Sequence, residues 1–152
     1  MNIINEQIRA FLEEEDMIAA LGNISACINM NYEGLNWAGF YLVRNNELVL
    51  GPFQGKPACT HIPFAKGVCG LTYTSRKPQR VDDVLSFPGH IACDSASRSE
   101  LCVPILVNDA CIGEIDLDAP VPSYFNEEHE KEMLQAAADI AASFLEHHWH
   151  ID

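Results

Sequence analysis

The sequence is poor in positive charge. Nine Lys and Arg residues stand against 22 Asp and Glu residues, which gives a formal net charge of −13. Proteins that bind nucleic acid rely on Lys and Arg side chains to neutralise phosphates, and anionic lipid surfaces attract the same residues. The charge therefore predicts that neither nucleic acid nor a membrane surface is a partner.

Long apolar runs and an export signal are also missing. No stretch approaches the roughly 20 apolar residues of a membrane span, and the opening MNIINEQ has no basic segment followed by an apolar run. We find no internal repeat, low-complexity tract or linker. Because 152 residues with 48% hydrophobic content can bury one substantial core, we expect a single domain over residues 1–152, located in the cytoplasm.

Six cysteines are present, and in a reducing compartment they are more often catalytic, metal-binding or buried than paired in structural disulfides. Three lie in apolar helical or strand patterns and are predicted to be buried and inert: Cys27, Cys102 and Cys111. Three lie among turn residues and are predicted to be more accessible: Cys59, Cys69 and Cys93. The last of these falls within residues 83–98, which we expect to be mostly loop.

The spacing of apolar residues predicts helices at both ends of the chain. Helical spacing runs through residues 4–27 and is broken near the acidic residues 13–16. It returns after Asn126, a residue type that caps helix N-termini, and the following Glu127 and Glu128 suit the positive end of the helix dipole.

Patterns of period two predict two hairpins between these helices. The first covers residues 37–50 with its turn at residues 45–46, and the second covers residues 101–118 with its turn at residues 108–109. Hairpins flanked by terminal helices predict an α+β fold with a central antiparallel sheet.

One face of the first strand is a candidate pocket wall. Trp37, Gly39 and Tyr41 share that face, and the glycine would leave a gap between two aromatic side chains for a small ligand. Ordinary sheet packing accounts equally well for the same pattern.

The last strand carries acidic residues on one face. Glu114, Asp116 and Asp118 alternate there together with Ile112. Because charged residues are rarely buried, we expect this face to be solvated surface. If it lines a pocket instead, the carboxylates raise one another's pKa and one of them can hold a proton near neutral pH.

Pairs of cysteine and histidine raise the question of a metal site. Cys59-x-His61 and His90-x-x-Cys93 supply two sulfurs and two imidazoles. The closely spaced cysteine pair of structural zinc sites is missing from the sequence, so we predict no metal.

Several segments combine into a recognisable pattern: residues 36–41 (NWAGFY), 51–55 (GPFQG), Cys59, 67–70 (GVCG), 87–95 (FPGHIACDS) and 113–118 (GEIDLD). Together they resemble the free methionine-(R)-sulfoxide reductases, which are single GAF domains, over about residues 16–145. Many GAF domains share the sheet, whereas this trio of cysteines with this loop is specific. The resemblance implies reduction of the R sulfoxide of free methionine, regeneration by thioredoxin and no bound cofactor.

The resemblance also implies roles for individual residues. Cys93 matches the nucleophile and Cys59 the preferred resolving cysteine, with Cys69 as an alternative or second one; the assignment between Cys69 and Cys93 stays open. The sulfoxide-binding carboxylates match Glu100, Asp116 and Asp118, and the pocket wall matches Trp37 and Tyr41. Since acidic surroundings disfavour a thiolate, we expect Cys93 to become reactive only once substrate is bound.

The second hairpin presents a conflict of geometry. With a two-residue turn and perfect register, Leu101 falls opposite Asp116, and Glu100 points to the other face. The carboxylates converge only if the loop has an odd number of residues, if a bulge occurs near Pro104 or Gly113, or if Glu100 precedes regular pairing.

Two other classes of function fit the same residues. One is a GAF sensory module that binds a small ligand such as a cyclic nucleotide, although an acidic pocket suits an ammonium group better than a phosphate. The other is a redox or metal sensor built from the thiols. The N-terminal helices could also pair two copies into a homodimer.

Overall fold

The predicted helices and strands occur in the predicted order, with further elements between the two hairpins, in a computed structural model that describes residues 2–91 and 93–150. The helices are α1 (Ile3–Phe11), α2 (Met17–Asn31), α3 (Gly67–Ser75) and α4 (Glu127–Glu146), with a short 3-10 turn, η1 (Val84–Ser86). The strands are β1 (Trp37–Arg44), β2 (Glu47–Gly55), β3 (His61–Ile62), β4 (Gln79–Val81), β5 (Ser99–Val107) and β6 (Ala110–Ala119). The predicted terminal helices and both hairpins are confirmed.

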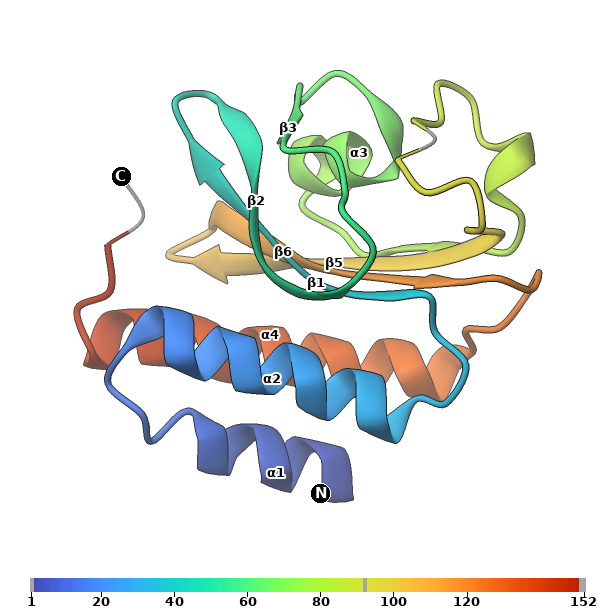
Figure 1. Cartoon of the computed structure of the whole chain (residues 1–152). Helices are drawn as coiled ribbons and strands as arrows, with labels where there is room; N and C mark the ends of the chain where they lie inside the picture. Colours follow the sequence, from blue (N-terminus) through green and yellow to red (C-terminus); the bar gives the residue numbers. More distant parts are fainter. Residues whose placement is uncertain (1, 92, 151–152) are drawn as a thin grey trace.

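The strands form one antiparallel sheet in the order β3-β2-β1-β6-β5-β4. Helices α2 and α4 cover one face and α1 lies on their outer side, while α3 and the loops around it cover the opposite face (Figure 1). This arrangement confirms the α+β prediction. Among the described residues, no helix combines the length and apolar character needed to cross a bilayer.

Local signals in the sequence set the ends of these elements. Asn126 accepts a hydrogen bond from the His129 N–H and completes a capping box at the start of α4. The hairpin turns use Asn45-Asn46 and Asn108-Asp109, whose φ angles lie between 51° and 66°. Asn and Asp tolerate this left-handed region, which two-residue hairpin turns require.

The apolar core lies between the sheet and the helices. Ala38, Phe40 and Leu42 of β1 face this layer, as the alternation predicted. Side chains from α1, α2 and α4 fill it, and the following are fully buried: Ile8, Leu21, Ile24, Met133 and Ile140.

A β-bulge in the second hairpin resolves the conflict of register. Ile105 pairs with Gly113 and Leu106 with Cys111, so Ile112 is the extra residue. The predicted bulge near Gly113 is therefore confirmed, and Glu100 lies within regular pairing, opposite Asp118. Ile112 itself packs with the helix-side core, so its predicted place on the acidic face is wrong.

Candidate active site

The face of the sheet opposite the helices carries three rows of side chains across β1, β6 and β5. Residues directly opposite one another in antiparallel strands project from the same face. The rows are Trp37–Asp118–Glu100, Gly39–Asp116–Cys102 and Tyr41–Glu114–Pro104. The bulge thus brings carboxylates from two strands into one cluster.

This acidic cluster is buried, and the prediction of a solvated face is wrong. Glu100, Asp116 and Glu114 are only 6%, 5% and 0% exposed, and Asp118 is half-buried. Sequence alternation could not reveal that α3 packs over this face of the sheet, or that loop residues such as His90, Cys93 and Ser97 line one pocket with these carboxylates. Charged groups removed from water in this way must take up protons or find partners.

Burial raises the pKa of every carboxyl in the cluster. The pKa of Glu100 is raised well above its ordinary value by burial and then by the negative charges of Asp116 and Asp118. Burial also raises the pKa of Asp116, although Glu100, Cys69 and His90 act in the opposite direction. Glu100 is accordingly the better candidate to carry a proton near neutral pH.

Cys69 lies above this cluster on α3, so the prediction of an accessible loop is wrong. It is 5% exposed, and its Sγ lies 3.7 Å from Glu100 Oε2. The neighbouring Cys102 thiol, burial and the negative charge of Asp116 all raise the pKa of Cys69. This thiol is therefore held in its neutral form.

Cys59 and Cys93 form a disulfide across 34 residues, with a Cα–Cα distance of 5.3 Å. Both lie in loops and are half-buried, as predicted from the turn residues around them. The Tyr41 hydroxyl donates a hydrogen bond to the Cys59 carbonyl oxygen at 2.8 Å. The pocket-wall tyrosine therefore also positions the cysteine loop.

The loop that carries Cys93 is fixed to the start of β1. The Asn36 amide donates to Asp94 Oδ2 at 3.0 Å and to Ser97 Oγ at 2.9 Å. The pKa of Asp94 is lowered by hydrogen bonds from the Ala96 N–H and from Asn36. Asp94 is thus a stable anion beside the nucleophile candidate.

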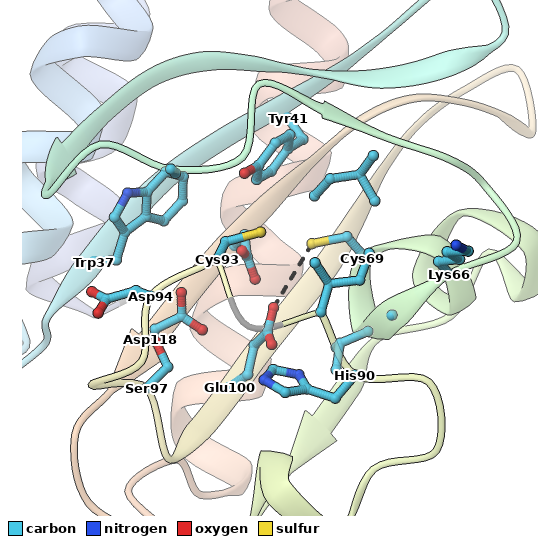
Figure 2. Close-up of a pocket in the computed structure, with 16 residues that line it drawn as sticks. Trp37, Tyr41, Lys66, Cys69, His90, Cys93, Asp94, Ser97, Glu100 and Asp118 are labelled. Atoms are coloured by element: carbon cyan, nitrogen blue, oxygen red, sulfur yellow. Dashed lines mark hydrogen bonds between the residues drawn. The ribbon is translucent and has the colours of Figure 1, made fainter.

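A cavity of about 50 Å³ lies between the sheet, α3 and this loop. Figure 2 shows the side chains that converge on it from these elements. The polar part of its lining comprises Lys66, Cys69, His90, Cys93, Asp94, Ser97, Glu100, Asp116 and Asp118, and the aromatic wall is Trp37 with Tyr41. Space of this size holds only a few water molecules.

The GAF domain family matches residues 15–145. Free methionine-R-sulfoxide reductase from Escherichia coli is 43% identical over 138 residues, covering 90% of this chain and 84% of that protein. The chain belongs to this reductase family of GAF domains. Its membership makes it an oxidoreductase.

Solved structures of the reductase family share the fold. The fRMsr of Staphylococcus aureus in its reduced form gives a TM-score of 0.88 at 46% identity, covering 93% of this chain and 92% of that one. The free methionine-R-sulfoxide reductase of Neisseria meningitidis, in complex with its substrate, gives a TM-score of 0.92 at 38% identity, covering 95% of this chain and 88% of that one.

All the site residues that the sequence predicted for a reductase of this family come together in space. Seven of the eight line the cavity: Trp37, Tyr41, Cys69, Cys93, Glu100, Asp116 and Asp118. The eighth, Cys59, is bonded to Cys93. The predicted ligand gap at Gly39 is wrong, because Phe53 occupies that space and stacks on Trp37 at a centroid distance of 5.2 Å.

Other residues at the site were missed by sequence reasoning. Asn36, His90 and Ser97 stand inside or beside the quoted motifs, but only the fold shows that they approach the carboxylates. Cys102 is buried as predicted, yet it contacts Glu114 and Cys69, and so it is not simply a core hydrophobe. Cys111, also predicted to be buried, is half-buried beside the bulge.

Proposed function

We propose that this enzyme reduces free L-methionine-(R)-sulfoxide to L-methionine, with Cys93 as nucleophile and Cys59 as resolving cysteine. The observation that carries the proposal is the Cys59–Cys93 disulfide at the wall of a pocket lined by buried carboxyls. That disulfide is the oxidised product that such a reaction would leave. The names of the relatives support the substrate.

The first step moves one oxygen from the substrate to the protein. The Cys93 thiolate attacks the sulfoxide sulfur, the sulfoxide oxygen gains a proton, and methionine leaves while Cys93 becomes a sulfenic acid. Cys93 loses two electrons and the substrate sulfur gains them. Because the developing negative charge lies on the oxygen, a proton donor beside it lowers the barrier.

Glu100 is the proposed proton donor. Its buried carboxyl has a pKa raised well above the ordinary value by burial, and it lines the cavity together with Cys93. Asp94, whose pKa is lowered by its hydrogen bonds, suits the substrate ammonium group instead. Lys66, exposed at the rim, suits the substrate carboxylate.

The second step regenerates the enzyme. The Cys59 thiol condenses with the sulfenic acid of Cys93, releasing water and forming the disulfide, and Cys69 serves as a second resolving thiol. A dithiol protein, which we propose is thioredoxin in the cytoplasm, then reduces the disulfide by exchange. Because the cavity of the disulfide form is only about 50 Å³, we propose that reduction widens it before the next substrate binds.

A turnover assay tests the proposal. Purified protein is mixed with free methionine-(R)-sulfoxide, thioredoxin, thioredoxin reductase and NADPH, and NADPH oxidation is followed. We expect turnover by the natural protein and a loss of about 10³-fold or more in Cys93→Ser, as for other covalent nucleophiles.

Two controls accompany this assay. Cys111→Ser changes a thiol outside the pocket and should leave turnover intact, and the S epimer should react poorly. The proposal fails if the natural protein shows no turnover of the R epimer. If Cys69→Ser, and not Cys93→Ser, abolishes the first turnover, the roles of these two thiols are reversed.

A further inference from the structure

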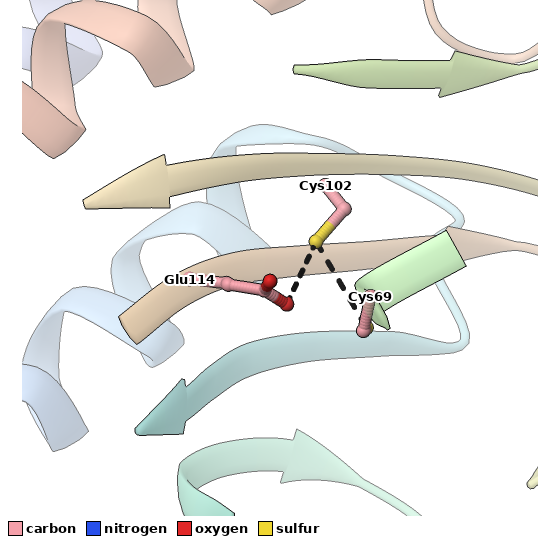
Figure 3. Close-up of side chains that lie close together, drawn as sticks. All are labelled: Cys69, Cys102 and Glu114. Carbon is pink, nitrogen blue, oxygen red and sulfur yellow. Dashed lines mark hydrogen bonds between the residues drawn. The ribbon is translucent and has the colours of Figure 1, made fainter. Parts of the chain in front are cut away.

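A second cluster of reactive side chains lies beneath the pocket, where α3 meets β5 and β6. Cys69 comes from α3, Cys102 from β5 and Glu114 from β6, and their side chains point toward one another (Figure 3). Cys102 Sγ lies 3.9 Å from Cys69 Sγ and 3.2 Å from Glu114 Oε1. All three residues are 5% exposed or less.

Two carboxyl oxygens in and beside this cluster have no hydrogen-bond partner. Within the described residues, Glu114 Oε2 and Asp116 Oδ1 are buried and make no hydrogen bond. The described residues form three ion pairs, and neither of these carboxyls takes part in them: Arg9–Asp139, His61–Glu47 and Arg98–Asp83. Buried polar atoms without partners are rare in native proteins and call for an explanation, such as an ion.

We propose that Cys69, Cys102 and Glu114 form a binding site for a thiophilic divalent cation of the Zn²⁺ type. One ligand atom from each lies within 4.8 Å of the other two. Zinc binds thiolate sulfur at about 2.3 Å and carboxylate oxygen at about 2.0 Å, so tetrahedral geometry requires roughly 3.8 Å between sulfurs and roughly 3.5 Å between sulfur and oxygen. The observed separations, 3.9 and 3.2 Å, are close to both.

Chemistry favours this class of ion over others. Two thiolates with one carboxylate suit Zn²⁺ or Cd²⁺, whereas Mg²⁺ and Ca²⁺ prefer sites built from oxygen alone. Asp116 and Glu100 lie near Cys69 in a second group with metal-ligand spacing, so further carboxylates stand close to the sulfur that the two groups share. Binding would release the thiol protons, and any carboxyl proton, to the buffer.

The proposed cation site is independent of the Cys59–Cys93 disulfide. Cys69 and Cys102 are free thiols while that disulfide is formed. The oxidised protein should therefore bind the cation as the reduced protein does. The inference does not require the proposed reductase activity, because ion binding is measured without substrate.

Calorimetric titration with Zn²⁺ provides the test, using the full chain after removal of metal by a chelator. We expect one equivalent to bind, with a measured heat that differs between buffers of unlike ionisation enthalpy because protons are released to the buffer. Titration with Cd²⁺ should produce the ultraviolet charge-transfer band of cadmium–thiolate bonds. Cys102→Val and Glu114→Gln should each weaken binding by at least about tenfold.

Matched variants identify which thiols hold the ion. Cys111→Ser, and Cys59→Ser combined with Cys93→Ser, should bind Zn²⁺ as the natural protein does. Circular dichroism melts establish that each variant is folded. If Cys102→Val does not fold, Glu114→Gln alone tests the cluster. The inference is overturned if the natural protein binds no Zn²⁺, if both cluster variants bind it unchanged, or if binding requires Cys59 and Cys93.

Discussion

Both faces of the sheet bury apolar side chains, but among the described residues the buried carboxyls lie on the face opposite the helices. The helix side packs aliphatic and aromatic residues such as Phe40, Leu117 and Ile140, all 0% exposed. The opposite side buries Glu100, Glu114 and Asp116 with two thiols. Burying apolar groups stabilises the fold, whereas a buried polar group without a partner costs about 1–3 kcal/mol.

This contrast indicates a division of work between the faces. Apolar burial on the helix side stabilises the fold and offsets the cost of burying polar groups on the acidic side. The acidic side holds groups whose pKa values are shifted by burial. Shifted pKa values and unpaired polar atoms are what general acid chemistry and ion binding require. The contrast can be tested by changing each face separately.

The largest expected effect is on the acidic side. Glu100→Gln keeps the shape of the side chain but removes the proton that we assign to the sulfoxide oxygen. We expect kcat/KM to fall by about 10²–10⁴-fold, with the free energy of unfolding unchanged or higher, because the carboxyl of residue 100 then no longer has to be buried. Steady-state kinetics and chemical denaturation measure the two quantities. An unchanged kcat/KM would remove Glu100 from the mechanism.

The next effect concerns the helix side. Ile140→Ala leaves a cavity beneath α4 and should lower the free energy of unfolding by about 2–5 kcal/mol. Below the melting transition, the rate per folded molecule should stay close to that of the natural protein. A large drop in kcat with little loss of stability would contradict the division between the faces.

The pH dependence of stability should also separate the faces. Burial raises the pKa of Glu114 well above its ordinary value, so the folded state holds this proton more tightly than the unfolded state. The contribution of Glu114 to stability is then full below about pH 4, the ordinary Glu range, and is lost as pH rises through the raised pKa. Each such proton gives a slope of up to about 1.4 kcal/mol per pH unit.

Glu114→Gln should therefore flatten the decline of stability with rising pH, as measured by thermal melts across pH 5–9. Glu146→Gln, a change at the exposed end of α4, is the matched control and should leave the profile alone. Identical profiles for the natural protein and Glu114→Gln would show that Glu114 binds no extra proton in the folded state.

The smallest effect is expected at the loop that carries Cys93. Asn36→Ala removes the hydrogen bonds to Asp94 and Ser97 and should cost about 1–2 kcal/mol of stability. We expect KM to rise by roughly tenfold, because the loop no longer holds one position. Asn31→Ala removes the hydrogen bond from Asn31 Nδ2 to Gln7 Oε1 on the helix side. It should cost similar stability without altering KM.

Much of the fold could be predicted because its signals are local. Asn-Asn and Asn-Asp turns, the Asn126 cap and the apolar periodicity each act within a few residues, and the structure follows them. Helix α3 was missed because its sequence GVCGLTYTS has two glycines and several β-branched residues, which are weak helix formers. Tertiary contacts stabilise it: Val68 and Thr72 are buried, and Phe64 stacks on Tyr73 at 3.7 Å.

The residues that form the site could be predicted from the sequence, but their burial could not. Family resemblance picked out the eight residues, and the fold brings them together. The burial of Glu114 and Asp116 depends on α3, which covers them from a distant part of the sequence. No pattern within β6 distinguishes a buried acidic face from a solvated one. The contact between Cys69 and Cys102 depends on the same packing of α3 over the sheet, so the sequence could not predict it either.

Ile112 has a consequence for how this site could arise or be lost. As the one residue of β6 without a partner in β5, it sets the phase of everything that follows it in the strand. Deleting it would make Leu106–Cys111 and Ile105–Gly113 consecutive pairs, so the bulge would close and Glu100 would stay opposite Asp118. Pairing of the full-length strand without the bulge would instead turn Glu100 to the opposite face from Asp116. The same arrangement of carboxylates can therefore arise in two ways, from a strand one residue shorter or from this strand with its bulge, and the number of codons between the turn and Gly113 decides which of the two is needed.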